Sequence, residues 1–121
     1  MRPRVFVPYR QQALSADRKT LIDKYPTLNR AEEFGDMVFL LSPNARPFDR
    51  NENSALQPLI EEMRPQLAGY TADDYLLLIG NPIIMSAMVA IAADASGGPV
   101  RFLQWSRERY IEVTGDLFED Q

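Results

Sequence analysis

The sequence predicts a small α/β domain with a three-layer, Rossmann-like architecture and a mostly parallel sheet of about five strands. Two uninterrupted apolar runs, Met37–Leu41 and Tyr75–Ile79, are typical of strands that are buried on both faces. Segments with helical start and stop signals separate the first four predicted strands, which favours parallel strands joined by crossovers. The last two predicted strands are close in sequence and predict an antiparallel C-terminal hairpin.

The first quarter of the chain predicts a strand followed by two helical segments. The strand Arg4–Pro8 is closed by its proline. Ser15 is a suitable cap for a helix that extends to about Tyr25, and Pro26 stops it. A short helical turn, Leu28–Phe34, then ends at the C-cap glycine Gly35.

The second quarter predicts a strand, a loop and a helix. The strand Met37–Leu41 is followed by the polar segment Asn44–Asn53, which we interpret as an exposed loop. Ser54 begins a capping-box pattern, and a helix is expected from there to about Ala68. Pro65 is expected to kink or split that helix.

The chain is organised around the uncharged segment Tyr75–Ala93, which predicts a buried strand, a tight turn and a buried helix. Gly80-Asn81-Pro82 ends the strand and supplies an N-cap and a first-turn proline for the helix Pro82–Ala95. Because this turn interrupts the apolar segment, a membrane span is not expected. The helix has two apolar stripes, Ile84, Met88, Ile91 and Ala95 on one and Met85, Val89 and Ala92 on the other. Two stripes predict that the helix is covered twice.

The C-terminal part predicts a hairpin and an acidic tail. Val100–Trp105 and Tyr110–Val113 are the expected strands, with Ile111 and Val113 facing one way and Tyr110 the other. Residues 114–121 form the expected acidic tail, and residues 1–121 are interpreted as a single domain.

Composition excludes several classes of chemistry. The 121 residues include no histidine and no cysteine, which rules out His-based triads, thiolate metal sites and disulfides. A net charge of −4 disfavours general nucleic-acid binding. The sequence therefore predicts no catalytic residues, no cofactor and no metal, although an enzyme using Asp, Glu, Ser, Tyr or Arg stays open. No signal peptide is visible, so the cytoplasm is the expected compartment.

One corner of the predicted sheet is a candidate ligand site. Gly80 and Asn81 lie where a parallel strand meets a helix N-terminus, a position that attracts anions. Arg10, Gln11, Ser42 and Asn44 follow other strands and are expected to converge there. A nucleotide or another small anion is the expected ligand class. The alternative is that Gly-Asn-Pro is only a good turn, because no complete phosphate-binding motif is present.

Three pairs of acidic residues were considered as metal or acid–base sites. They are Glu32-Glu33, Glu61-Glu62 and Asp73-Asp74. The first two pairs are predicted on exposed helix faces, and the third precedes a strand. Solvated surface is the expectation for all three pairs.

Two groups of residues are candidate interface positions. Trp105, Arg107, Arg109 and Tyr110 gather at the predicted hairpin and are of the types that dominate binding hot spots. They could equally stack across the hairpin. The second helical stripe, Met85, Val89 and Ala92, would be exposed in a monomer, so a two-fold homodimer is expected.

Three segments within residues 34–113 are distinctive when taken together: FGDMVFLLSP, DDYLLLIGNPIIMSAMVAIAA and VRFLQWSRERYIEV. In these segments the sequence resembles a group of small accessory proteins encoded by tailed bacteriophages. The resemblance implies a phage accessory protein in the host cytoplasm and transfers no catalytic residues. The expected function is therefore non-catalytic, acting through protein–protein interaction with itself or with a host protein, with small-anion binding as the alternative.

Overall fold

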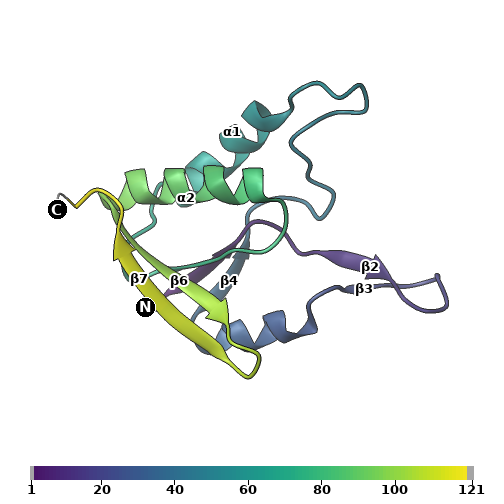
Figure 1. The fold of residues 1–121 in the computed structure, drawn as a ribbon, viewed down its shortest axis with the longest axis horizontal. Coiled ribbons are helices and arrows are strands. Elements are labelled where there is room, and N and C mark those ends of the chain that lie inside the picture. Colours follow the sequence, from purple (N-terminus) through teal and green to yellow (C-terminus); the bar gives the residue numbers. More distant parts are fainter. Residues whose placement is uncertain (1, 120–121) are drawn as a thin grey trace.

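The structure, a computed structural model, describes residues 2–119 and contains a five-stranded mixed sheet with the strand order β4-β1-β5-β6-β7 (Figure 1). The first four strands in this order are parallel, and β7 pairs antiparallel with β6. The strands are β1 (Arg4–Val7), β4 (Asp36–Phe39), β5 (Tyr75–Leu77), β6 (Pro99–Trp105) and β7 (Tyr110–Asp116). The predicted α/β class, the mostly parallel sheet and the C-terminal hairpin are confirmed.

Helices cover the two faces of the sheet unequally. The helices α1 (Leu56–Leu67) and α2 (Pro82–Ser96) lie together on one face, whereas the other face carries the 3-10 helix η1 (Pro26–Glu33) (Figure 1). The Rossmann-like three-layer arrangement remains a prediction, because the link between β1 and β4 contains a hairpin and η1 instead of an α-helix. Within residues 2–119, no helix has the length and apolar character needed to cross a bilayer.

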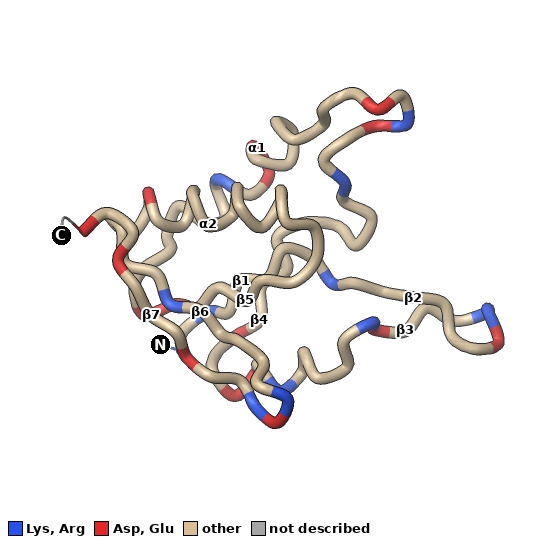
Figure 2. The backbone as a smooth tube through the Cα atoms, viewed as in Figure 1, with Lys and Arg blue, Asp and Glu red and all other residues tan. Residues whose placement is uncertain are grey.

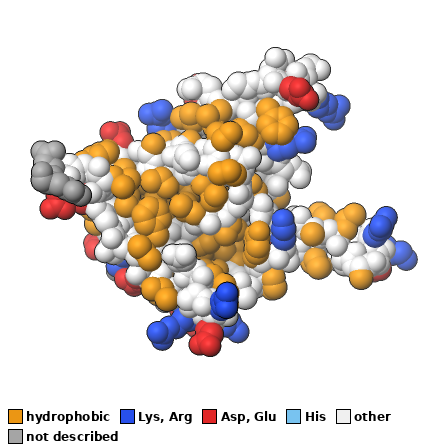
Figure 3. Space-filling model, viewed as in Figure 1, with side chains coloured by type: hydrophobic (Ala, Val, Ile, Leu, Met, Phe, Trp, Pro, Cys, Tyr) orange, Lys and Arg blue, Asp and Glu red, His pale blue; other side chains and the backbone are white. Residues whose placement is uncertain are grey.

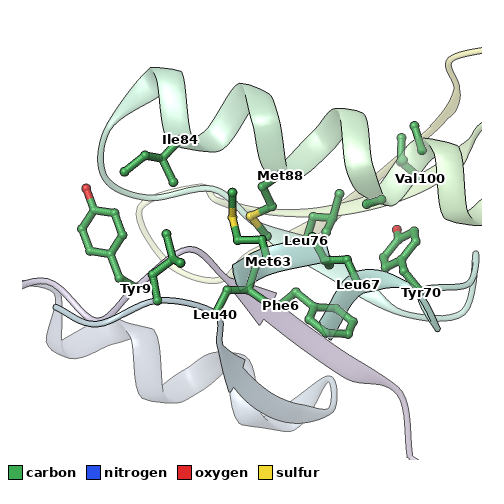
Figure 4. Packing of buried hydrophobic residues seen from close by; sticks show 13 residues of the cluster. Phe6, Tyr9, Leu40, Met63, Leu67, Tyr70, Leu76, Ile84, Met88 and Val100 are labelled. Atoms are coloured by element: carbon green, nitrogen blue, oxygen red, sulfur yellow. The ribbon is translucent and has the colours of Figure 1, made fainter. Parts of the chain in front are cut away.

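The larger core lies between the sheet and the two α-helices (Figure 4). Met63 of α1 and Met88 of α2 meet over Phe6 and Leu76 of the sheet, and all four are almost fully buried. The helix α2 is therefore covered twice, as its sequence predicts, and α1 of the same chain supplies the second cover. Ala92 is fully buried in this core, so it is not available to a second copy of the chain.

The helix predicted from Ser15 to Tyr25 is wrong. This segment instead belongs to a two-stranded antiparallel hairpin, β2 (Gln12–Leu14) and β3 (Leu21–Asp23), which we call the arm and which projects from the body (Figure 1). The turn between β2 and β3 explains why a hairpin forms here instead of a helix. The Asp17 carboxylate accepts hydrogen bonds from the Ser15 hydroxyl and the Lys19 amide, which closes a polar loop rather than a helical turn.

The first turn of α1 also differs from the prediction. The predicted capping box at Ser54 is absent: the N-cap is Ala55, which makes no side-chain capping bond, and Ser54 pairs with Phe48 in an isolated bridge. Pro65 lies in the last turn of a continuous helix and does not split it.

The central turn and the C-terminal segment follow the sequence closely. Asn81 caps α2 by accepting from the amides of Ile83 and Ile84, and Gly97 ends the helix in the left-handed conformation. The strand β7 continues to Asp116, so residues 114–116 of the predicted acidic tail are strand. The tail residues 120–121 lie outside the described residues.

The expectation that Asp73-Asp74 is solvated surface is wrong for Asp74. Its side chain is buried, and its carboxylate accepts hydrogen bonds from the Arg4 amide at 2.9 Å, the Arg4 guanidinium at 3.0 Å and the Thr71 amide at 3.0 Å. Burial raises the pKa of Asp74, but the bonds from Arg4 and Thr71 outweigh burial and leave the pKa below its ordinary value. Asp74 therefore ties the start of β1 to the turn before β5.

Candidate functional site

The corner at Gly80 and Asn81 is closed by the side chain of Tyr9. This corner lies between β1 and β5, where the chain order reverses across the sheet and where open α/β sheets place ligands. The buried Tyr9 hydroxyl accepts a hydrogen bond of 2.8 Å from the Asn81 amide. A Cβ atom added to Gly80 would lie 2.5 Å from the Tyr9 hydroxyl oxygen. Tyr9 thus occupies the space that the sequence suggests for an anion (Figure 4).

The other residues predicted to converge on this corner have different partners. Arg10 forms an ion pair of 2.8 Å with Asp23 and lies over the Phe39 ring, 4.4 Å from its centroid, at the base of the arm. Ser42 accepts a hydrogen bond from the Asn44 amide at the surface. Asn44 lines a separate cavity beside the corner.

That cavity, which we call the polar pocket, has a volume of about 430 Å³ and lies beside the carboxyl ends of β1 and β4. Its lining contains two cationic side chains and no acidic one: Tyr9, Gln11, Gln12, Lys24, Pro43, Asn44, Ala45 and Arg46. The Oε1 atom of Gln11 is buried without a hydrogen-bond partner. The pocket therefore offers positive charge, and one side chain of its lining has a buried acceptor without a partner.

A second cavity, which we call the apolar groove, opens where β5 and β6 separate. The β5–β6 pairing ends at Leu77 and Leu103, after which the chain turns from β5 toward α2 while β6 continues to Trp105. The groove has a volume of about 720 Å³, and it is lined mainly by apolar side chains on both sides: Tyr25, Thr27, Leu77, Leu78, Ile79, Gly80, Met85, Phe102, Leu103, Gln104, Trp105, Tyr110 and Val113. Figure 3 shows hydrophobic side chains gathered across this face of the body.

One wall of the groove is aromatic. The Trp105 and Tyr110 rings pack edge to face with their centroids 5.0 Å apart, and the Arg30 guanidinium lies 5.6 Å from the Trp105 ring. Burial raises the pKa of Tyr110 above its ordinary value, so this side chain is neutral at physiological pH. The wall therefore presents a rigid apolar surface.

The structure separates the residues predicted to form an interface into three groups. Met85, Trp105 and Tyr110 line the apolar groove. Val89 is half-buried against the core, and Ala92 is enclosed by it. Arg107 and Arg109 are exposed in the β6–β7 turn, outside the groove lining.

The sequence interpretation missed Tyr9, Lys24 and Arg46, and it placed Gln11 at the Gly80 corner instead of in the polar pocket. Three of these side chains reach the polar pocket only because the segment before and after the arm folds back as a hairpin, which the helix prediction excluded. Arg46 comes from the loop after β4, where no periodic pattern fixes side-chain directions. The dipeptides Ala13-Leu14 and Leu21-Ile22, on either side of a polar turn, are compatible with a hairpin, but their apolar residues fit one face of a helix as well.

Within residues 2–119, the structure contains no group of acidic side chains arranged to hold a metal ion. The sequence model of the Phage Pam3 gp32-like protein family matches residues 3–117. The chain belongs to this family. The resemblance to phage proteins is therefore confirmed, over a longer stretch than residues 34–113. No curated protein and no solved structure matches this phage protein.

Proposed function

We propose that this phage protein is a non-catalytic accessory or regulatory protein that acts in the host cytoplasm by binding protein, with the apolar groove as its docking surface. The observation that carries the proposal is the groove itself, about 720 Å³ in volume and lined mainly by apolar side chains. Exposed apolar patches of this kind mark interaction sites, because leaving them in water is unfavourable.

The residue types in the groove also support protein binding. Trp105 is partly buried in the groove lining and is held rigid by packing against the buried Tyr110 ring, and tryptophan is among the residue types that carry most of the energy of protein interfaces. The exposed residues Leu78 and Val113 continue the apolar surface to the rim. The missing histidines and cysteines and the charge of −4 agree with a binding role more than with catalysis or nucleic-acid binding.

Replacing Val113 by glutamate is expected to abolish capture of protein partners by the groove. Val113 is half-exposed on the groove wall, so glutamate fits without entering the core but places a charge in the contact. The measurement is affinity capture from phage-infected cells, followed by quantitative mass spectrometry. We expect at least a tenfold loss of the proteins that the wild type retains.

Thr114→Glu is the matched control, since Thr114 is the exposed neighbour that faces the opposite side of β7. Equal capture by the wild type and both variants would contradict a docking role for the groove.

A second candidate function is binding of a small anion in the polar pocket. What supports it is the pair of cations Lys24 and Arg46, which face the pocket without an acidic residue in its lining. A phosphorylated compound is the ligand class that this positive charge favours. This pocket replaces the corner at Gly80 as the candidate anion site, because Tyr9 fills that corner.

A thermal-shift series with ribose 5-phosphate and nucleoside monophosphates tests this candidate. A ligand at 100 times its dissociation constant is expected to stabilise the folded state by about 2.7 kcal/mol. Lys24→Ala and Arg46→Ala should remove the shift, whereas Arg107→Ala, in a distant exposed turn, should retain it. An unchanged melting temperature with every phosphate compound would exclude anion binding at this pocket.

A further inference from the structure

The arm carries apolar surface that its own chain does not cover. Leu14, Leu21 and Ile22 are 57%, 60% and 49% exposed, and none of them belongs to either core cluster. In the hairpin register, Leu14 lies opposite Leu21 on one face, and Ala13 lies opposite Ile22 on the other. Both faces of the arm therefore expose apolar side chains, and burying them against another surface would be favourable.

The body holds the arm only at its base. The Arg10–Asp23 ion pair and the stacking of Arg10 on Phe39 fix the point where the arm leaves the sheet. Beyond this point the arm projects into solvent as a two-stranded ribbon with three residue pairs (Figure 1). Such ribbons are at best marginally stable alone in water, so an external contact is the natural source of their order.

The apolar groove has the shape that the arm requires. A flat surface would cover one face of the ribbon. The lining of the groove instead combines Met85 of α2, Val113 of β7 and Trp105 of β6 with Tyr25, so a ribbon lying in it would meet apolar side chains from several elements. Tyr25 follows β3 by two residues and lines the groove, so the arm starts at the rim of the groove. A two-fold axis at this rim would lay each arm across the groove of the other copy.

Charge also favours this arrangement. Residues 10–25 carry four basic and two acidic side chains, a net charge of +2. The whole chain has 13 basic and 17 acidic residues, so the remainder has nine and fifteen, a net charge of −6. Figure 2 shows basic residues at the base and tip of the arm. Arm-to-body contact between two copies is attractive, whereas contact between two bodies is repulsive.

We propose that the arm of one copy lies in the apolar groove of a second copy, reciprocally, in a two-fold homodimer. This inference rests on the proposed function of the groove as a protein-docking surface and names its occupant as residues 12–23 of an identical chain. The arm is then an exchanged element that completes the groove.

Cysteine cross-linking tests the contact between the arm of one copy and the groove of the other. The chain contains no cysteine, so no native thiol competes with the introduced ones. The double variant Leu21→Cys/Leu78→Cys is expected to form a disulfide-linked dimer under mild oxidation, since Leu21 lies on the arm and Leu78 on the groove wall. The matched control is Leu21→Cys/Ala68→Cys, in which Ala68 is an exposed residue at the end of α1 outside the groove lining. Cross-linking of both double variants to the same extent would overturn the proposal.

Sedimentation velocity supplies the second readout. The wild type is expected to show a concentration-dependent dimer, and Leu21→Glu should raise its dissociation constant at least 100-fold while the far-UV spectrum stays unchanged. A wild type that is monomeric at 100 µM, or a dimer that Leu21→Glu leaves intact, overturns the arm exchange. The groove proposal fails separately, when Val113→Glu affects neither dimerisation nor capture of other proteins.

Discussion

Replacing Gly80 by alanine is expected to destabilise the protein by about 3 kcal/mol, from backbone strain and a steric clash together. Gly80 has a φ of +105°, which a residue with a side chain rarely adopts. The added Cβ atom would lie 2.5 Å from the hydroxyl oxygen and 2.6 Å from the Cζ atom of Tyr9. Because the Tyr9 ring is buried and its hydroxyl holds the Asn81 amide, it cannot move without losing that bond.

Gly97→Ala is the matched control for the backbone part of this effect. Gly97 also has a positive φ, +81°, but a Cβ atom there would meet no atom within 4 Å. We therefore expect a loss of only about 1 kcal/mol from the left-handed backbone. Chemical denaturation of both variants measures the difference, which isolates the clash.

The same clash predicts a coupling between Gly80 and Tyr9. In a Tyr9→Leu background, which lacks the outer ring atoms, Gly80→Ala should cost about as much as Gly97→Ala. If Gly80→Ala is as costly with leucine as with tyrosine at position 9, Tyr9 does not close the corner. In that case Tyr9 would not separate the corner at Gly80 from the polar pocket, and the two would form one open site.

The central unit of the fold was predictable because its signals are local. The same strand–turn–helix is favoured by five local features: a continuous apolar run, Gly80, the capping residue Asn81, Pro82 and a C-cap glycine. The C-terminal hairpin was predictable for the same reason, since alternation placed Ile111 and Val113 on the face opposite to Tyr110.

The arm was not predictable from these signals. Its apolar residues, Leu14, Leu21 and Ile22, also fit one face of a helix, and Ser15 is a good helix cap. Only the side-chain bonds of Asp17 and the backbone bonds between the strands decide for a hairpin. The apolar side chains of the arm are exposed, so burial in the core does not impose either pattern.

The candidate sites depend on side chains that are distant in sequence. Tyr9 and Gly80 are 71 positions apart, and the polar pocket combines residues from before, within and after the arm. The predicted corner was correct in its turn and cap, but the filling of its space by Tyr9 is a packing result. The groove arises where β5 leaves the sheet earlier than β6, a difference in strand length that an apolar run does not encode.

Replacing Asp74 by asparagine is expected to destabilise the protein by about 2 kcal/mol at pH 7, the range for charged hydrogen bonds. The carboxylate of Asp74, only 5% exposed, accepts bonds from Arg4 and Thr71 that hold β1 against the turn before β5. An amide has one acceptor oxygen instead of two and no charge to pair with Arg4. Because Arg4 is partly exposed and also bonds to the Gly69 carbonyl, the loss stays below that of a fully buried pair.

The difference between the wild type and Asp74→Asn should shrink as the pH falls. The pKa of Asp74 lies below its ordinary value in the folded state, so the folded state binds this proton less readily than the unfolded state. The stabilisation is therefore present above the unfolded pKa of about 3.9 and disappears as the pH falls through the lower folded value. Urea unfolding at pH 7, 4 and 2.5 measures the difference in the free energy of unfolding between the wild type and Asp74→Asn.

The control is Asp73→Asn, at the exposed neighbouring position. It should change the free energy of unfolding by less than about 0.5 kcal/mol at each pH. A pH-independent loss in Asp74→Asn would mean that shape rather than charge makes Asp74 important.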